Sequence, residues 1–195
     1  MRLAFLASNN GSSLRAIVAA IEAGELDALP VLAVSNKRGA PALDFARERG
    51  VATRVIPTVA DPSGADRALA RALGEAGAEW VILSGYLRKL GPETLKAFAG
   101  RVLNIHPALL PKHGGEGLYG RRVHEGVIAA GETVSGASVH LVDDEYDHGA
   151  VISRREVPVL PGDTPETLEA RVMAAEPRLF VETLRRIASG ELRVG

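Results

Sequence analysis

The sequence predicts an α/β protein built on a doubly wound, mostly parallel sheet. Short apolar runs typical of buried strands alternate with longer segments in which apolar residues recur at helical spacing. The strand-like runs are apolar at consecutive positions, which indicates that helices cover both faces of the sheet. The last two runs are joined by a short polar segment, so we expect them to form an antiparallel addition at the C-terminal side.

The expected elements follow one another in a regular order. Strands are expected over residues 3–7, 31–34, 51–56, 80–86, 101–106, 138–142 and 150–157. Helices are expected after each of the first three strands, in the short stretch before 101, over 121–130 and after an N-cap at Thr164. The third helix is expected to bury Ala68, Leu69, Ala72 and Leu73, and the last to bury Leu168, Val172, Leu179, Val181 and Leu184.

No internal repeat, low-complexity segment or change of composition marks a linker, so residues 1–195 are expected to form a single domain. The glycine-rich stretch 111–120 is expected to be a loop. Whether residues 113–120 and 143–149 become ordered only when ligands bind is a question that the sequence leaves open.

The composition restricts the class of partner. The formal net charge is −1 and there are no long runs of like charge, so the electrostatic footprint of a nucleic-acid or anionic-membrane binder is missing. The absence of cysteine excludes disulfides, thiolate nucleophiles and cysteine-ligated metals. The apolar run 3–7 is too short for a signal or transmembrane segment. We therefore expect small-molecule partners, neither nucleic acid nor membrane, and a cytoplasmic location.

The strongest candidate for chemistry is the sequence Asn104-Ile105-His106-Pro107 at the end of the fifth strand. Side chains alternate along a strand, so Asn104 and His106 should share one face while Ile105 points to the other. Pro107 has no backbone donor and favours an extended residue before it, which ends the strand just after the histidine. An amide and an imidazole at a strand's carboxyl end can stabilise an oxyanion or transfer a proton, although an isolated histidine there is often only structural.

A second candidate is the turn Asn10-Gly11-Ser12-Ser13 between the first strand and the first helix. Free N–H groups at a helix start favour an anion such as phosphate, and two serine hydroxyls add donors. An N-cap turn without any ligand is an equally good interpretation of this pattern alone. This turn contains neither a Gly-x-Gly-x-x-Gly pattern nor a Walker lysine, so neither a dinucleotide nor a nucleoside triphosphate is indicated here.

The acidic segment 143–147 ordinarily would be a solvated hairpin loop. If it folds over the strand ends, one of its carboxylates would favour the imidazolium form of His106, raising its pKa and orienting the ring. The pattern does not say which carboxylate. It lacks the alternating ligands of a calcium loop, and the five histidines show no metal-binding spacing, so no metal is predicted.

Several segments, taken together and in order, resemble the phosphoribosylglycinamide formyltransferases, also called glycinamide ribonucleotide transformylases, of the folate-dependent formyltransferase family. The resemblance runs nearly end to end. It rests on 8–14 (SNNGSSL), 35–37 (SNK), 85–90 (GYLRKL), 104–112 (NIHPALLPK), 138–140 (SVH) and the loop around Asp147. It implies a Rossmann-like formyltransferase fold, with the Asn-Ile-His-Pro and Leu-Leu-Pro signature shared by folate-dependent formyl transferases in general.

The resemblance also implies an activity and a site. The expected reaction is formyl transfer from the co-substrate 10-formyltetrahydrofolate to the amine of glycinamide ribonucleotide, in purine biosynthesis. Asn104, His106 and Asp147 would be catalytic, with Asp147 raising the pKa of the histidine. Gly11, Ser12 and Ser13 would bind the phosphate, and Glu176 the ribose. The folate would be bound by Asn104 and by two segments, Leu87, Arg88, Lys89 and Leu90, and Asp143, Asp144, Glu145, Tyr146 and Asp147.

Two alternatives remain at the level of sequence. One is a non-catalytic module that binds a sugar phosphate at Gly11, Ser12 and Ser13. The other is a formyltransferase with a different amine acceptor such as methionyl-tRNA, although such enzymes carry an added RNA-binding domain and this chain shows no basic face. A monomer and a homodimer are both compatible with the sequence.

Overall fold

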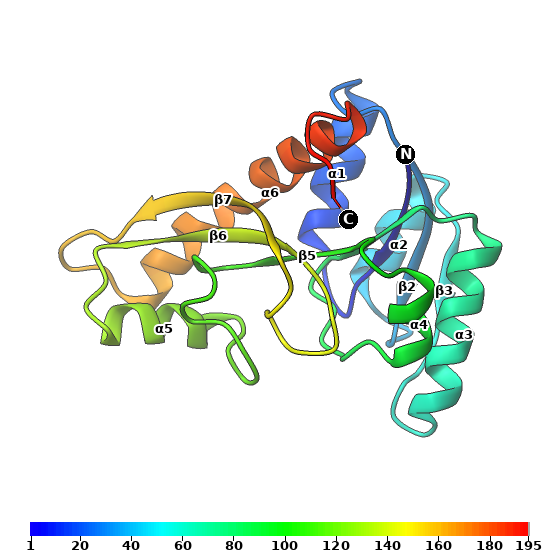
Figure 1. The fold of residues 1–195 in the computed structure, drawn as a ribbon, viewed down its shortest axis with the longest axis horizontal. Coiled ribbons are helices and arrows are strands. Elements are labelled where there is room, and N and C mark those ends of the chain that lie inside the picture. The colour runs from blue at the N-terminus through cyan, green and yellow to red at the C-terminus, as the bar shows by residue number, and fades with distance from the viewer. Residues whose placement is uncertain (195) are drawn as a thin grey trace.

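A seven-stranded mixed sheet runs through the whole molecule in the computed structural model, which describes residues 1–194 (Figure 1). The strand order is β3-β2-β1-β4-β5-β6-β7. The first five strands are parallel, and β6 and β7 are antiparallel additions beyond β5. The strands are β1 (Arg2–Leu6), β2 (Leu29–Ser35), β3 (Thr53–Val55), β4 (Trp80–Leu83), β5 (Val102–His106), β6 (Val134–Leu141) and β7 (Val151–Pro158).

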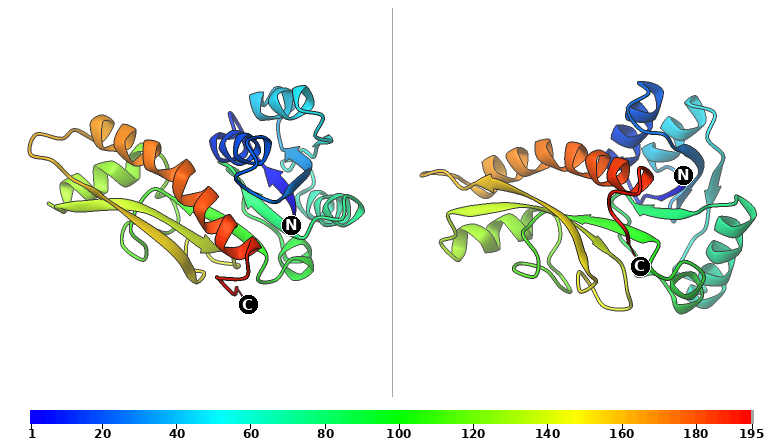
Figure 2. Two further views of the ribbon diagram at one scale, coloured as in Figure 1. Left: turned by 90° about the horizontal axis from the view of Figure 1, so that it is seen from above. Right: turned by 45° about the horizontal axis from the view of Figure 1, so that its top comes forward.

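Helices cover both faces of the parallel part, as the two views of Figure 2 show. The helices are α1 (Ser12–Glu22), α2 (Pro41–Glu48), α3 (Pro62–Glu75), α4 (Pro92–Ala97), α5 (Arg121–Ala129) and α6 (Pro165–Ala188). Alternate residues of β1 enter different cores. Leu3 and Phe5 pack with α1, α2 and α6, while Ala4 and Leu6 pack with α3 and α4. The predicted doubly wound sheet with its antiparallel addition is confirmed.

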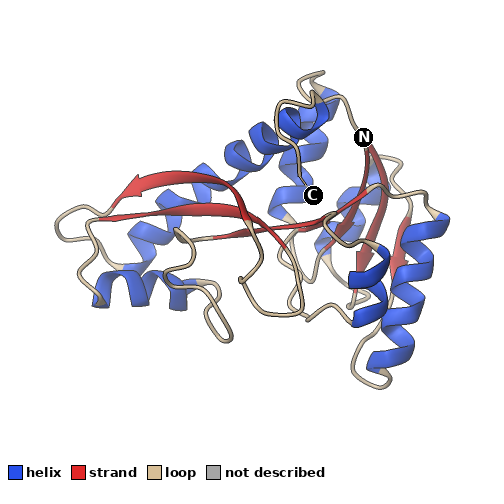
Figure 3. Ribbon diagram, viewed as in Figure 1, coloured by secondary structure: helices blue, strands red, loops and turns tan. Residues whose placement is uncertain are grey.

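The C-terminal half extends to one side as a long two-stranded ribbon, β6 and β7, with α5 and α6 beside it (Figure 3). Thr164 caps α6 as expected, because its hydroxyl accepts from the N–H of Thr167, whose own hydroxyl accepts from the N–H of Thr164. This long helix also contacts α1 and α5. It thereby connects the parallel part of the fold to the ribbon.

The differences from expectation lie at the ends of elements and on helix faces. β3 is an edge strand with one neighbour and is limited to three residues, whereas β6 begins four residues earlier than expected because it pairs with β7 over its whole length. Ala68 is exposed, and Ala65 occupies the expected buried position, because α3 buries the i, i+4, i+7 row of its surface. In α6, Phe180 is fully buried and Val181 only partly.

A buried carboxylate joins α3 to α4. Asp66 accepts hydrogen bonds from the N–H of Glu93 (2.9 Å), the N–H of Thr94 (3.1 Å) and the Thr94 hydroxyl (2.6 Å). These donors belong to the first turn of α4, where backbone N–H groups have no partner within the helix. The side chain of Asp66 therefore fixes the position of the segment that follows β4.

We predict that Asp66→Ala lowers the free energy of unfolding by about 3 kcal/mol, because it leaves buried donors without partners. Urea denaturation monitored by circular dichroism measures this change. The matched control is Asp44→Ala, which removes an exposed carboxylate paired with Arg47 on α2 and should cost under about 1 kcal/mol. Equal effects of the two substitutions would contradict the role given to Asp66.

Candidate active site

Two polar side chains share one face at the end of β5. Leu103 belongs to the core on the α6 side of the sheet, and Ile105 packs against this same core. Val102 belongs to the core on the opposite side. Alternation along the strand therefore puts Asn104 and His106 on the same face as Val102, as predicted. His106 is only 3% exposed. The structure thus brings an amide and a nearly buried imidazole together.

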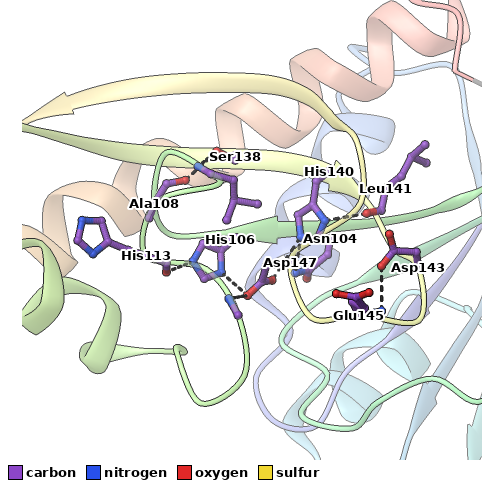
Figure 4. A network of polar contacts seen from close by, with 12 residues as sticks. Asn104, His106, Ala108, His113, Ser138, His140, Leu141, Asp143, Glu145 and Asp147 are labelled. Carbon is purple, nitrogen blue, oxygen red and sulfur yellow. Dashed lines mark hydrogen bonds and ion pairs between the residues drawn. The ribbon is translucent and has the colours of Figure 1, made fainter.

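Asp147, from the loop between β6 and β7, lies directly against this pair (Figure 4). Its Oδ2 atom is 3.3 Å from His106 Nδ1 and accepts a hydrogen bond from the N–H of Gly115 (3.0 Å), and its Oδ1 atom is 3.5 Å from His140 Nε2. Burial acts to raise the pKa of Asp147, but the contacts with His106 and His140 outweigh it and hold that pKa well below its usual range. The carboxylate is therefore ionised.

The backbone of Asp147 is also unusual, with φ of 54° in the left-handed region. A non-glycine residue in this region is uncommon and is found most often where the surrounding structure requires it. Here the conformation returns the loop over the polar face of β5, so that the carboxylate reaches His106. The carboxylate that the sequence left undetermined is thus the one that the resemblance implied.

His140 is part of the same cluster and was not among the residues predicted from the sequence. It lies opposite Asn104 in the antiparallel β5–β6 pair and is 2% exposed. Its Nδ1 atom is 2.7 Å from the carbonyl oxygen of Leu141, and its Nε2 atom is 3.1 Å from Asn104 Nδ2. In the tautomer that donates from Nδ1, Nε2 accepts from the amide of Asn104. This contact orients the amide.

A signal for His140 was present in the sequence. Ser138 and His140 alternate on β6 as Asn104 and His106 do on β5, and the register pairs Ser138 with His106. The buried Ser138 hydroxyl donates to the carbonyl of Ala108 (2.7 Å) and accepts from the N–H of Leu110 (3.0 Å). The polar face of β6 thus both orients Asn104 and fixes the turn that follows His106.

The second ring nitrogen of His106 is occupied by the main chain. Its Nε2 atom is 2.8 Å from the carbonyl oxygen of His113, in the loop that follows β5 (Figure 4). Both nitrogens of the ring therefore face oxygen acceptors, one a carboxylate and one a carbonyl. A ring in such a position can donate from both nitrogens when it is protonated.

The turn predicted to bind phosphate lies at the end of β1. Gly11 is the N-cap of α1, with φ of 67°, and a Cβ atom there would lie 2.9 Å from the Cβ of Ala42. The N–H of Leu14 is taken up by the Ser84 hydroxyl (2.9 Å). Within residues 1–194, no acceptor takes up the N–H groups of Ser12 and Ser13, which remain available to an anion.

This turn and His106 lie at the same edge of the sheet. β4 separates β1 from β5, so the two strand ends are roughly 10 Å apart at the usual spacing between neighbouring strands. The Ser8 hydroxyl connects the intervening segments, because it donates to Asn36 Oδ1 (2.7 Å) and accepts from the N–H of Leu87 (2.8 Å). A molecule with an anionic group and a reactive group at its two ends can span this distance.

Glu176 lies on α6, where it is partly buried. Burial raises its pKa to about 7, while the positive charge of His106 opposes the shift and the negative charge of Glu169 adds to it. The carboxyl group is therefore close enough to His106 to respond to its charge. At neutral pH it is present in both its protonated and its ionised form.

A cleft of about 480 Å³ opens between α3, α4 and the segment after β4. Its walls are largely apolar and include Ile56, Leu69 and Leu95. Of the residues predicted to bind folate, Arg88, Lys89, Leu90 and Asp144 line it. The other predicted folate residues of these two segments do not line the cleft; among them are Leu87, Asp143, Glu145 and Tyr146.

Tyr146 and Asp143, which lie outside the cleft, have other contacts. The centre of the Tyr146 ring lies 5.6 Å from Nζ of Lys89, so the two predicted folate segments approach each other there. Asp143 Oδ2 is 2.9 Å from His148 Nδ1, and Asp143 Oδ1 accepts from the N–H of Glu145. These contacts give the 143–149 loop its own internal structure.

Across residues 1–194, no group of three or more His, Cys, Asp or Glu side chains is arranged to hold a metal ion. Among the same residues, no helix is long and apolar enough to cross a membrane.

Comparison with known proteins gives a consistent result. The sequence profile described as formyl transferase matches residues 1–184. The phosphoribosylglycinamide formyltransferase of Escherichia coli is 35% identical and covers 100% of this chain and 90% of its own length. The chloroplastic phosphoribosylglycinamide formyltransferase of Arabidopsis thaliana is 37% identical over 98% of this chain. The matched part makes up 67% of that longer protein.

A solved structure shows the same similarity in three dimensions. Glycinamide ribonucleotide transformylase 1 from Symbiobacterium toebii superposes with a TM-score of 0.90 at 34% identity, over 100% of this chain and 91% of the other. A profile that spans nearly the whole sequence, relatives above 30% identity and a shared fold agree with one another. The chain belongs to the formyl transferase family.

Proposed function

We propose that this chain transfers the formyl group of 10-formyltetrahydrofolate to the amine of N1-(5-phospho-D-ribosyl)glycinamide in purine biosynthesis, as the names of its relatives indicate for those proteins. The observation that carries the proposal is the cluster at the end of β5, where an ionised Asp147 lies against His106 and His140 beside Asn104. The residues 1–195 are proposed to act as one formyltransferase domain.

The chemistry of formyl transfer fits the polar groups of this cluster. Attack of a neutral amine on the formyl carbon creates a tetrahedral carbon that carries a negatively charged oxygen. Asn104 and His106 can donate hydrogen bonds to that oxygen, each worth about 3 kcal/mol of transition-state stabilisation. Asp147 cannot donate, but its carboxylate lies 3.3 Å from His106 Nδ1, where it orients the ring and faces the positive charge that the ring carries when it is protonated. The bond between the formyl carbon and the folate nitrogen then breaks, this nitrogen takes the proton of His106, and the proton that the attacking amine loses restores the ring.

The orientation of Asn104 supports this assignment. His140 Nε2 takes up one side of the amide nitrogen, so a second N–H of the same group remains for the substrate. Both catalytic donors are thus held by neighbours on the β6 side, Asn104 by His140 and His106 by Asp147. Such prior positioning lowers the entropy lost when the transition state forms.

The acceptor is proposed to bind with its phosphate at the turn after β1. The unpartnered N–H groups of Ser12 and Ser13 and the dipole of α1 favour an anion there. Its amine would then reach toward His106, and its ribose would meet Glu176 on α6. The formyl folate is proposed to enter through the cleft lined by Arg88, Lys89, Leu90 and Asp144.

The phosphoribosyl acceptor is favoured over methionyl-tRNA by the anion site itself, since a helix start of this kind suits one compact phosphate group. A cytoplasmic location and a monomeric or homodimeric state are likewise proposals.

The direct test of function is a spectrophotometric assay of tetrahydrofolate formation, comparing glycinamide ribonucleotide with other amines. A protein that binds sugar phosphates but never consumes the formyl donor would instead be the non-catalytic module.

We predict that His106→Ala and Asp147→Asn each lower kcat by at least about 100-fold, since each removes a charge or a donor needed in the transition state. Steady-state kinetics with both substrates measures the effect. The matched control is Asp27→Asn, because Asp27 is an exposed carboxylate in the turn before β2, at the opposite end of the strands. Retention of full kcat in Asp147→Asn would rule out the proposed role of that carboxylate.

We predict that Gly11→Ala raises KM for the phosphoribosyl acceptor about tenfold and changes kcat little. The methyl group would collide with Ala42 and displace the backbone N–H groups of the turn. Gly24→Ala is a matched control, since Gly24 has φ of 72° and open space around it at the other end of α1. The control shares the backbone strain but should leave KM unchanged.

We predict that Glu176 makes the protein less stable as pH rises. Its pKa in the folded state is about 7 against a reference value of 4.5, so the folded protein holds more protons between these values. The free energy of unfolding therefore falls as pH increases from about 4.5 to 7 and is level above that range. Glu176→Gln should remove this fall and be more stable at pH 8 by about 1–2 kcal/mol, as urea denaturation at several pH values would show.

A further inference from the structure

The carbonyl of His113 occupies the one nitrogen of His106 that Asp147 does not. Nε2 is 2.8 Å from this carbonyl oxygen, so an N–H on Nε2 already has an acceptor. Because Nδ1 faces Asp147, Nε2 is the nitrogen that would donate to the reacting group in the proposed reaction. The His113 carbonyl and the substrate therefore compete for the same donor. Residues 111–115, called here the cap segment, must therefore move before the transition state can form.

The carboxylate of Glu132 contacts two side chains of the cap segment, those of Lys112 and His113. Glu132, in the turn after α5, lies 2.9 Å from Lys112 Nζ through Oε1 and 3.2 Å through Oε2. Its Oε1 atom is also 3.5 Å from His113 Nε2. The hydrogen bond from Lys112 holds the pKa of Glu132 below its usual range, so the carboxylate is charged at neutral pH.

Other contacts bring the cap segment close to Asp147 and show that its conformation is constrained. The N–H of Gly115 donates to Asp147, and a Cβ atom on Gly114 would lie 3.2 Å from the Cβ of Asp147. His113 itself has φ of 55°, in the left-handed region that costs a residue with a side chain free energy. Contacts elsewhere must offset that cost, and those of Glu132 are in the right place to do so.

We propose that Glu132 is a positioning residue that holds the cap segment closed, so that the His113 carbonyl occupies His106 Nε2 until the substrates displace it. The segment has two states, and the closed state excludes the reaction. The apparent affinity for a substrate is then reduced by the fraction of molecules in which Nε2 is free. The kinetic part of this inference rests on the proposed function, whereas the contact itself does not.

The expected effect is modest, because Lys112 is 69% exposed and exposed ion pairs contribute little. Glu132→Gln removes the charge and keeps the shape of the side chain. It should lower KM for the formyl donor about threefold while kcat stays unchanged. Lys112→Gln should act in the same direction, and the double variant should add little, since both residues belong to one contact.

The matched control is Glu125→Gln, which removes an exposed carboxylate from α5 and should leave KM unchanged. Raising the salt concentration should reduce the difference between the native protein and Glu132→Gln, because exposed charges are screened. A merely structural role would instead change thermal stability without this selective change in KM. A raised KM, a lowered kcat or a result equal to the control would overturn the proposal.

A second measurement does not depend on turnover. In the substrate-free protein labelled with ¹⁵N in histidine, NMR follows hydrogen exchange at His106 Nε2, which the His113 carbonyl should protect. Glu132→Gln should speed this exchange and Glu125→Gln should not. If formyl transfer itself is absent, this readout still tests the closed contact. Equal exchange in all three proteins would overturn it.

Discussion

The site depends on a carboxylate that is held between two imidazoles. Asp147 has a side chain only 12% exposed, and a buried charge of this kind is costly unless it is paired. His106 supplies that pairing from β5, and the N–H of Gly115 donates a hydrogen bond to the same carboxylate oxygen, so the ion is held by two partners. The contact with His106 joins the β6–β7 loop to the end of β5, and the contact with Gly115 joins the same loop to the cap segment.

The order and type of the elements were accessible from the sequence because local patterns determine them. Leu3 to Leu6 alternate between two cores, and the loss of apolar pattern after Pro107 marks the change from parallel to antiparallel pairing. The sharing of one face by Asn104 and His106 follows from strand geometry alone. Element ends were less accessible: β3 is limited to the three residues that pair with β2, and such pairing depends on strand order rather than on composition.

Of the site, the sequence supplied the residues on single strands and turns but few of the contacts between them. His140 is opposite Asn104 because of the register of two strands that are 36 residues apart at this point, and the alternation of Ser138 and His140 does not say which residues of β5 they meet. The contact of the His113 carbonyl with His106 is invisible in the same way, since a main-chain group has no sequence signature. Asp147 came from the resemblance, because the acidic segment contains other carboxylates that spacing alone cannot separate.

The antiparallel ribbon has an implication for how such a scaffold can diversify. The groups proposed to act on the carbon centre come from β5, β6 and the loop after β6, whereas the turn proposed to bind an anion lies two strands away, at the start of α1. Exchanging the turn after β1 or the exposed surface of α6 would leave the Asp147 cluster untouched. A lineage could in this way recruit new amine partners while inheriting an intact chemical step, and its selectivity would drift independently of its catalytic power.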